Sequence, residues 1–159
     1  MAPDKALADS AVLMEFYVFP QHVNHMGTLF GGQLLSWIDQ AGLLSAEKFT
    51  RRPCVTAGMD AIHFHRPIPQ GQLVRIQSQV NFTGRTSLEV GVRVDAQYPY
   101  DEDPPVHCVS AYLTYVALNQ QRRPVPIPHG LIFTDIERKR WREAEERRVA
   151  RWRETPDES

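Results

Sequence analysis

One segment of this chain has the pattern of a helix without a polar side. From Gln33 to Ala46 the sequence reads QLLSWIDQAGLLSA, which is apolar or small almost all the way round a helix. Such a pattern predicts a helix buried on every side, so the rest of the chain must pack around it. Asp39 is the only charged residue in the segment. Because an ionised carboxylate is costly in apolar surroundings unless it is paired, hydrogen-bonded or placed in a wet pocket, Asp39 is the first candidate for chemistry.

Two glycines, Gly31 and Gly32, come directly before this helix. Glycine lets backbone or ligand approach closely. The first N–H groups of a helix have no partner inside the helix, so here they are free to face an oxygen. A buried acid combined with an open helix start indicates an acyl-transfer site.

The composition excludes several classes of protein. The chain has 159 residues, which fits one domain with a sizeable core. Its formal net charge of −1 does not point to nucleic acid or to an anionic membrane surface as a partner. No apolar run approaches the ~20 residues needed to span a bilayer. We therefore expect no nucleic-acid partner and no membrane partner.

The N-terminus and the cysteines indicate a cytoplasmic location. The first residues lack a basic segment followed by a long apolar stretch, so they do not resemble a secretory signal. Cys54 and Cys108 do not have the spacing of metal ligands. We expect both to be buried free thiols in a reducing compartment.

Strand-forming segments lie on both sides of the helix. One precedes it over residues 11–19, and the others follow over residues 54–64, 72–82, 86–96 and 106–118. One strand, one helix and then consecutive strands joined by tight turns predict an α+β domain with an antiparallel sheet.

The chain divides into three parts, a flexible N-terminus over residues 1–10, the domain over residues 11–128, and a strap with a charged helix over residues 129–159. The charges of this last helix are of mixed sign, which favours a solvated helix over a nucleic-acid clamp. The side chains that could dock it on the domain or on a neighbouring subunit are Ile136, Trp141 and Trp152.

The residues around the helix start match a known pattern. The arrangement Asn24-x2-Gly27-x2-Phe30-Gly31-Gly32-x6-Asp39 resembles the signature of hotdog-fold acyl-CoA thioesterases, in the acyl-CoA hydrolase branch that includes the bacterial YciA-like and brain-type enzymes. The resemblance covers roughly residues 12–128 and continues in the segments 55–60, 64–71, 84–87 and 111–117.

This resemblance implies a fold, a substrate and an assembly. The fold would be a five-stranded antiparallel sheet wrapped round one central helix. Dimers would join their sheets edge to edge, often as trimers of dimers. The substrate would be a thioester of coenzyme A that is cleaved without a metal, so no cofactor is expected and coenzyme A is part of the substrate. The family's catalytic acid falls on Asp39.

The chemistry of thioester hydrolysis gives roles to the residues near the helix start. Asp39 can act as general base to water or attack directly as a nucleophile, and the sequence leaves both open. The backbone amides of Gly31 and Gly32 are the natural donors to the developing oxyanion. Asn24 either touches the substrate carbonyl or water, or holds the loop by side-chain hydrogen bonds. Thr28 stands where family members often carry Asn or Asp, so it can hydrogen-bond but adds no charge.

Coenzyme A carries several phosphates, so cations should lie near its binding site. Arg51, Arg52 and Arg66 are candidates for these contacts, and none of them stands out. The segment Arg85-Thr86-Ser87 could contact phosphate or pantetheine, although a turn with an exposed arginine explains it equally well. His63 and His65 alternate on one strand, but without a third ligand at useful spacing they do not predict a metal site. The residues expected to contact coenzyme A are His25, Phe30, Arg66, Arg85, Thr86 and Ser87.

The spacing between Gly32 and Asp39 suggests that the site needs two subunits. Seven residues at ~1.5 Å of rise per residue separate the carboxylate from the helix start by roughly 10 Å. One carbonyl carbon cannot readily meet both groups, so we expect one of them to come from a second subunit.

Two other functions remain open at this point. One is a non-catalytic hotdog module that binds acyl-CoA for regulation. The other is dehydration of a hydroxyacyl thioester, which is disfavoured because that chemistry pairs a histidine with an acid and this helix contains no histidine.

Overall fold

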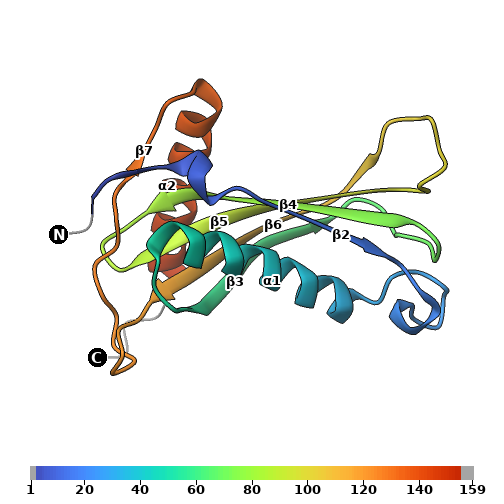
Figure 1. Ribbon diagram of the computed structural model, residues 1–159, viewed down its shortest axis with the longest axis horizontal. Helices are drawn as coiled ribbons and strands as arrows, with labels where there is room; N and C mark the ends of the chain where they lie inside the picture. Colours follow the sequence, from blue (N-terminus) through green and yellow to red (C-terminus); the bar gives the residue numbers. More distant parts are fainter. Residues whose placement is uncertain (1–2, 155–159) are drawn as a thin grey trace.

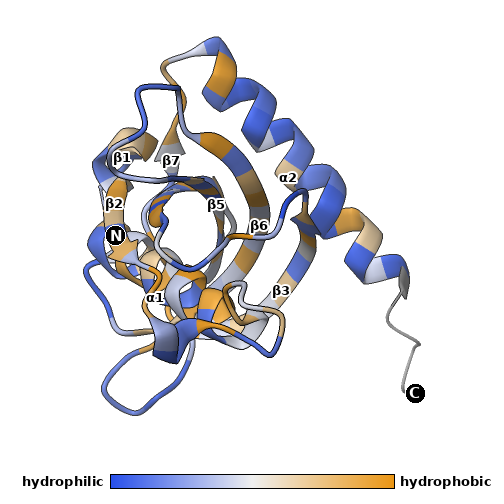
Figure 2. Ribbon diagram, turned by 90° about the vertical axis from the view of Figure 1, so that its right-hand side faces the viewer, coloured by the Kyte–Doolittle hydropathy of each residue, from blue (hydrophilic) through white to orange (hydrophobic). Residues whose placement is uncertain are grey.

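A five-stranded antiparallel sheet curves around one helix in the computed structural model, which describes residues 3–154. The spatial order of the strands is β2-β4-β5-β6-β3. Helix α1 lies on the concave inner face of the sheet, and helix α2 lies across the convex outer face (Figures 1 and 2). The predicted α+β hotdog architecture is therefore confirmed. The elements are β1 (Lys5–Ala6), η1 (Leu7–Ser10), β2 (Val12–Tyr17), η2 (Pro20–His22), α1 (Gly31–Thr50), β3 (Cys54–Phe64), β4 (Leu73–Thr83), β5 (Ser87–Gln97), β6 (Val106–Ala117), β7 (Gly130–Leu131) and α2 (Asp135–Glu154).

The core forms where alternating strand residues meet α1. The period of two along a strand places every second side chain on the inner face. Ser78 is a polar residue in the inward row of β4. Its hydroxyl is satisfied because it donates to the main-chain oxygen of Ala41 at 2.8 Å and lies 2.6 Å from the Ser45 hydroxyl. The inward rows of the central strands are Val74, Ile76, Ser78 and Val80, then Leu88, Val90, Val92 and Val94, then Val109, Ala111, Leu113 and Tyr115.

Helix α1 is not buried on every side within one protomer, contrary to the prediction from its composition. The sheet covers one face of the helix, which includes Trp37, Ile38 and Ala41. A stripe at every fourth position stays open to solvent, because residues four apart share a helix face. The exposed residues of this stripe are Gly32, Ser36, Gln40, Leu44 and Lys48.

The N-terminal segment also differs from its prediction. Residues 1 and 2 lie outside the described residues, but residues 5–10 pack on the domain instead of forming a flexible start. Strand β1 pairs in parallel with β7. Leu7 and Ser10 are buried, and the Ser10 hydroxyl accepts a hydrogen bond from the Val80 amide at 2.8 Å. The buried Leu7 side chain and the hydrogen bond of Ser10 therefore hold this segment on the domain, although its composition alone does not predict a regular element.

Helix α2 is docked on the outer face of the sheet through its arginines. Arg147 forms an ion pair with the buried Glu89 of β5, with 2.6 Å between Nη2 and Oε1, and its guanidinium lies 3.6 Å from the ring centroid of Tyr112. Arg151 pairs with Asp60 of β3 at 3.0 Å. Of the predicted docking side chains, Trp141 packs on Phe82, whereas Ile136 and Trp152 are exposed. Residues 155–159 of the predicted tail lie outside the described residues.

Removing the Arg147 side chain should destabilise the protein strongly. Arg147→Ala leaves Glu89 buried without its cation, and breaking one half of a buried pair costs about 3–5 kcal/mol. We expect a loss near the lower end, measured as the free energy of unfolding in urea, because Arg147 keeps some solvent contact. Lys139→Ala is the matched control, since the Lys139–Glu143 pair on the same helix is exposed and should contribute less than about 1 kcal/mol. Equal effects of the two substitutions would contradict this role for Arg147.

Residues 3–154 contain no helix that is long and apolar enough to cross a membrane.

Candidate active site

Asp39 lies in the middle of α1 with its carboxylate turned toward strands β3 and β6. Its Oδ1 atom accepts a hydrogen bond from the Thr56 hydroxyl at 2.8 Å and another from the Tyr115 hydroxyl at 2.8 Å. The residue is half-buried. No cation within residues 3–154 forms an ion pair with it. An ion pair with an arginine or lysine inside the protomer would explain Asp39 as a purely structural group. Residues 3–154 contain no such pair.

Strand register explains why these two hydroxyls meet the same carboxylate. Thr56 and Tyr115 are directly opposite each other in the β3–β6 pair, so their side chains share the face toward α1. Burial raises the pKa of Tyr115 far above its usual range, and the hydrogen bond to Asp39 raises it further. The tyrosine therefore stays protonated and can only act as a donor to the carboxylate. The sequence alone gives neither residue a role, because their meeting at Asp39 depends on the register of β3 and β6 and on which face of the sheet meets α1.

Asn24 organises the loop before α1. Its side-chain oxygen accepts hydrogen bonds from the Met26 amide at 2.9 Å, from the Thr28 amide at 3.3 Å and from the Thr28 hydroxyl at 3.3 Å. The backbone N–H of Asn24 in turn donates to the main-chain oxygen of Thr28 at 2.8 Å. These contacts are those of the loop-holding alternative, and they engage the Thr28 hydroxyl as well. A direct role of Asn24 on the substrate stays a prediction.

The start of α1 is open, and a pocket lies beside it. Phe30 is the N-cap residue, and no side chain among the described residues caps the helix. A Cβ atom at Gly31 would meet nothing within 4 Å, whereas one at Gly32 would meet the Phe30 ring at 2.7 Å. The pocket has a volume of about 330 Å³. Its lining residues are Thr28, Leu29, Gly31, Phe64, His65, Arg66 and Pro67.

The predicted site residues fall into two groups within one protomer. Thr28, Gly31 and Arg66 share the pocket at the end of β3, while Asp39 bonds to Thr56 near the beginning of β3. The segment from Arg85 to Ser87 also lies at the Asp39 end, because Leu88, Tyr115 and Thr56 are successive partners across the sheet. His25 and Phe30 are exposed in the loop. One protomer alone thus brings together only parts of the predicted site.

Three histidines gather where β3 ends beside β6. The ring centroids of His63 and His65 are 6.4 Å apart, and those of His65 and His107 are 4.9 Å apart. Among the residues that the structure describes, no three His, Cys, Asp or Glu side chains are grouped as metal ligands.

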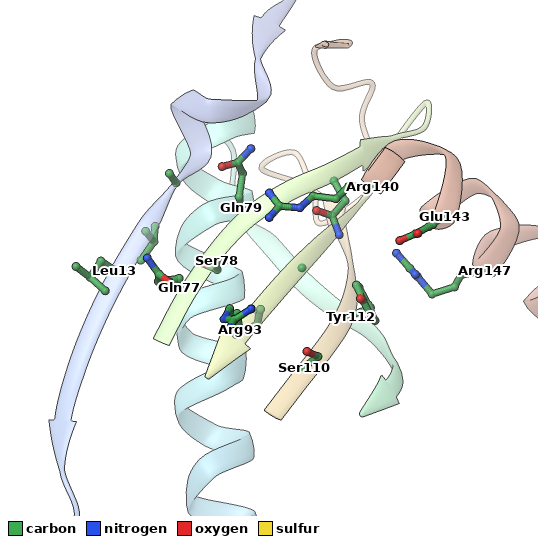
Figure 3. Close-up of a pocket in the computed structure, with 15 residues that line it drawn as sticks. Leu13, Gln77, Ser78, Gln79, Arg93, Ser110, Tyr112, Arg140, Glu143 and Arg147 are labelled. Atoms are coloured by element: carbon green, nitrogen blue, oxygen red, sulfur yellow. The ribbon is translucent and has the colours of Figure 1, made fainter. Parts of the chain in front are cut away.

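A larger cleft of about 480 Å³ lies on the other face of the sheet, between α2 and strands β2, β4, β5 and β6 (Figure 3). Gln77, Ser110 and Arg140 line it, and Asp39 does not. The other two arginines of the cleft already have acidic partners, since Arg147 pairs with Glu89 and Arg93 pairs with Asp95. The acid in the cleft, Glu143, already pairs with Lys139 at 3.9 Å, and no helix start is among the residues that line the cleft in the part of the chain that the structure describes.

Among the known proteins that this chain resembles in sequence are acyl-CoA thioesterases. The model of the thioesterase superfamily matches residues 26–99. An uncharacterized acyl-CoA thioester hydrolase of Bacillus subtilis, YkhA, is 38% identical over 129 residues, which are 81% of this chain and 74% of that protein. Mammalian acyl-CoA thioesterases also match, and the chain spans 23–34% of their length.

Solved structures agree over nearly the whole chain. A hexameric acyl-CoA thioesterase superposes with a TM-score of 0.90 at 30% identity, covering 95% of this chain and 96% of that one. The acyl-CoA hydrolase of Staphylococcus aureus, in complex with butyryl coenzyme A, coenzyme A and coenzyme A disulfide, superposes with a TM-score of 0.88 at 32% identity, covering 96% and 94%. Structures of that enzyme also exist with an aspartate, an asparagine or a threonine replaced by alanine.

Proposed function

The chain belongs to the acyl-CoA thioester hydrolases of the thioesterase superfamily, and on this basis we propose that it hydrolyses an acyl-coenzyme A to a carboxylic acid and free coenzyme A. In this proposal the Asp39 carboxylate acts as general base or as nucleophile. The observation that carries the proposal is the state of that carboxylate. Asp39 is half-buried, two hydroxyls hold its Oδ1, and Oδ2 has no hydrogen-bond partner within residues 3–154. A carboxylate oxygen without a cation or donor is available to take a proton from water or to attack a carbonyl carbon.

The start of α1 supplies the complementary group. A thioester carbonyl becomes an oxyanion as the tetrahedral intermediate forms, and backbone N–H groups at a helix start stabilise that charge. The Gly31 and Gly32 amides are suited to this because no side chain of the described residues caps the helix. The pocket beside Gly31 also contains Arg66, which is exposed and can approach a phosphate of coenzyme A.

Strand β3 supports a two-fold dimer. It is an edge strand of 11 residues, and β6 is the only strand beside it within residues 3–154. It exposes Val55, Met59 and Phe64. A long apolar edge is a ready site for pairing with another strand. Antiparallel pairing of two β3 strands about their midpoints sets the end of one strand beside the beginning of the other.

This pairing completes the site. The helix-start pocket lies at the end of β3, and Asp39 lies near its beginning, so the partner's pocket comes next to Asp39. The partner's Arg66 then joins Arg85, Thr86 and Ser87 on the side of the site that would hold coenzyme A. We propose that each site uses Asp39 of one subunit and the Gly31 and Gly32 amides of the other, and that the dimers assemble further into hexamers, as in a structural neighbour of this chain.

The variants of the Staphylococcus aureus enzyme add support. The asparagine, aspartate and threonine replaced there follow each other in the same order and at the same spacing as Asn24, Asp39 and Thr56 here. Thr56 donates to Asp39 in this structure, so we include it among the active-site residues. We also propose a cytoplasmic location, which the two free buried cysteines support.

The function is tested by a colorimetric thiol-release assay on acyl-CoAs of increasing chain length. We expect release of coenzyme A from at least one of them at a kcat within the range of about 1–10³ s⁻¹ that is usual for enzymes. Binding of these acyl-CoAs without any release of thiol would overturn the enzymatic proposal and favour a regulatory acyl-CoA-binding module.

A further inference from the structure

The Tyr115 side chain is a polar group deep in the core, and its hydroxyl points at the proposed catalytic acid. The residue is fully buried. Its hydroxyl lies 2.8 Å from Asp39 Oδ1 and 3.1 Å from the main-chain oxygen of Asp39. A buried tyrosine hydroxyl needs an acceptor, and its single proton is given to one of these two oxygens or shared between them. The carboxylate oxygen is both the nearer and the charged acceptor, so it is the stronger partner of the hydroxyl.

The two hydroxyls on Asp39 act on the same oxygen atom. Thr56 and Tyr115 both donate to Oδ1, from neighbouring strands. The terminal torsion of an aspartate is broad, so one donor alone leaves the carboxylate plane free to turn. Two donors from different directions fix that plane and leave Oδ2 as the oxygen that faces the substrate.

We propose that Tyr115 is a positioning residue of the active site, which together with Thr56 sets the plane of the Asp39 carboxylate and presents Oδ2 to the water or the thioester carbonyl. This inference rests on the proposed function. Tyr115 touches neither substrate nor the reacting atoms, and it acts only through Asp39.

Gly42 provides independent support, because it makes room for this contact. A Cβ atom at position 42 would overlap the Tyr115 hydroxyl and lie 3.1 Å from the ring carbons Cε2 and Cζ. Glycine inside a helix is destabilising relative to alanine. The close approach of the Tyr115 hydroxyl to α1, one turn after Asp39, therefore explains why a glycine stands at position 42.

The first test compares two tyrosines of the same strand. Tyr115→Phe removes only the hydroxyl and should lower kcat about 10- to 100-fold, since small errors in the position of a catalytic group have effects of this size. KM should stay within about twofold, because the substrate does not contact Tyr115. Tyr112→Phe is the matched control, as Tyr112 faces Arg147 on the outer side of the sheet, and its kcat should equal that of the wild type.

The second test reaches the same contact from the helix. Gly42→Ala should displace the hydroxyl and lower kcat in the wild-type background, whereas in the Tyr115→Phe background it should lower kcat by a much smaller factor. A kcat of Tyr115→Phe within twofold of the wild type, with Asp39→Asn inactive, would overturn the positioning role and leave the proposed function standing. Equal losses from Gly42→Ala in both backgrounds would also overturn it. A wild-type protein that releases no thiol would overturn both.

Discussion

Asp39→Asn should lose thioester hydrolysis almost completely while keeping its fold. Asparagine has the shape of aspartate, and its side-chain oxygen can still accept the hydrogen bonds that Thr56 and Tyr115 donate. What it cannot do is take a proton from water or attack the carbonyl carbon. General base catalysis contributes about 10²- to 10⁴-fold to a rate, so we expect kcat to fall by that factor in the thiol-release assay.

Glu47→Gln is the matched control for this variant. Glu47 is a half-buried acid on the same helix, two turns after Asp39, and the structure shows it near the other end of α1 from the Gly31 pocket. Its replacement should leave kcat unchanged. The midpoint of thermal unfolding should stay close to that of the wild type for both variants. An Asp39→Asn protein that turns over within about threefold of the wild type would remove Asp39 from the mechanism.

The sequence predicts the elements of this fold better than their arrangement. The helix predicted over Gln33 to Ala46 lies within α1, Gly31–Thr50, and each predicted strand is found with the same bounds or with small shifts at its ends. Local periodicity decides such elements. The strand order β2-β4-β5-β6-β3 depends on pairing between distant segments, which no local pattern contains.

The same limit applies to the candidate site. Asp39, Gly31 and Gly32 could be identified because a lone acid and a glycine pair stand out in an apolar segment. Thr56 and Tyr115 could not, since their relation to Asp39 depends on the register of β3 and β6 and on which face of the sheet meets α1. Ordinary strand residues become part of the site only through tertiary packing.

The charge pattern of helix α2 does not reveal which of its charges are solvated and which are paired with the sheet. Mixed charges at helical spacing indicated a solvated helix. Glu89, however, stands in the cleanest alternating strand and faces outward, so its burial depends on what covers the outer face. Arg147 covers it. A partner for a buried acid that lies 58 residues away along the chain is not visible in local periodicity.

The division of one site between two subunits has the second large expected effect, and it can be tested with two inactive variants. Asp39→Asn removes the acid, and Gly31→Pro removes one oxyanion donor. Proline is tolerated at the first position of a helix. Phe30 before it has φ −63° and ψ 129°, which suits a residue that precedes proline, and a Cβ atom at Gly31 meets nothing. Gly31→Pro should therefore fold, and the loss of one oxyanion donor lowers kcat by about 10²- to 10³-fold.

Co-expression of these two variants in equal amounts is the measurement that decides the matter. In a two-fold dimer, half of the dimers are mixed, and each mixed dimer has one site that combines the intact Asp39 of one subunit with the intact helix start of the other. We expect a specific activity of about a quarter of the wild-type value, against almost none for either variant alone. A mixed preparation no more active than the two separate variants would contradict it.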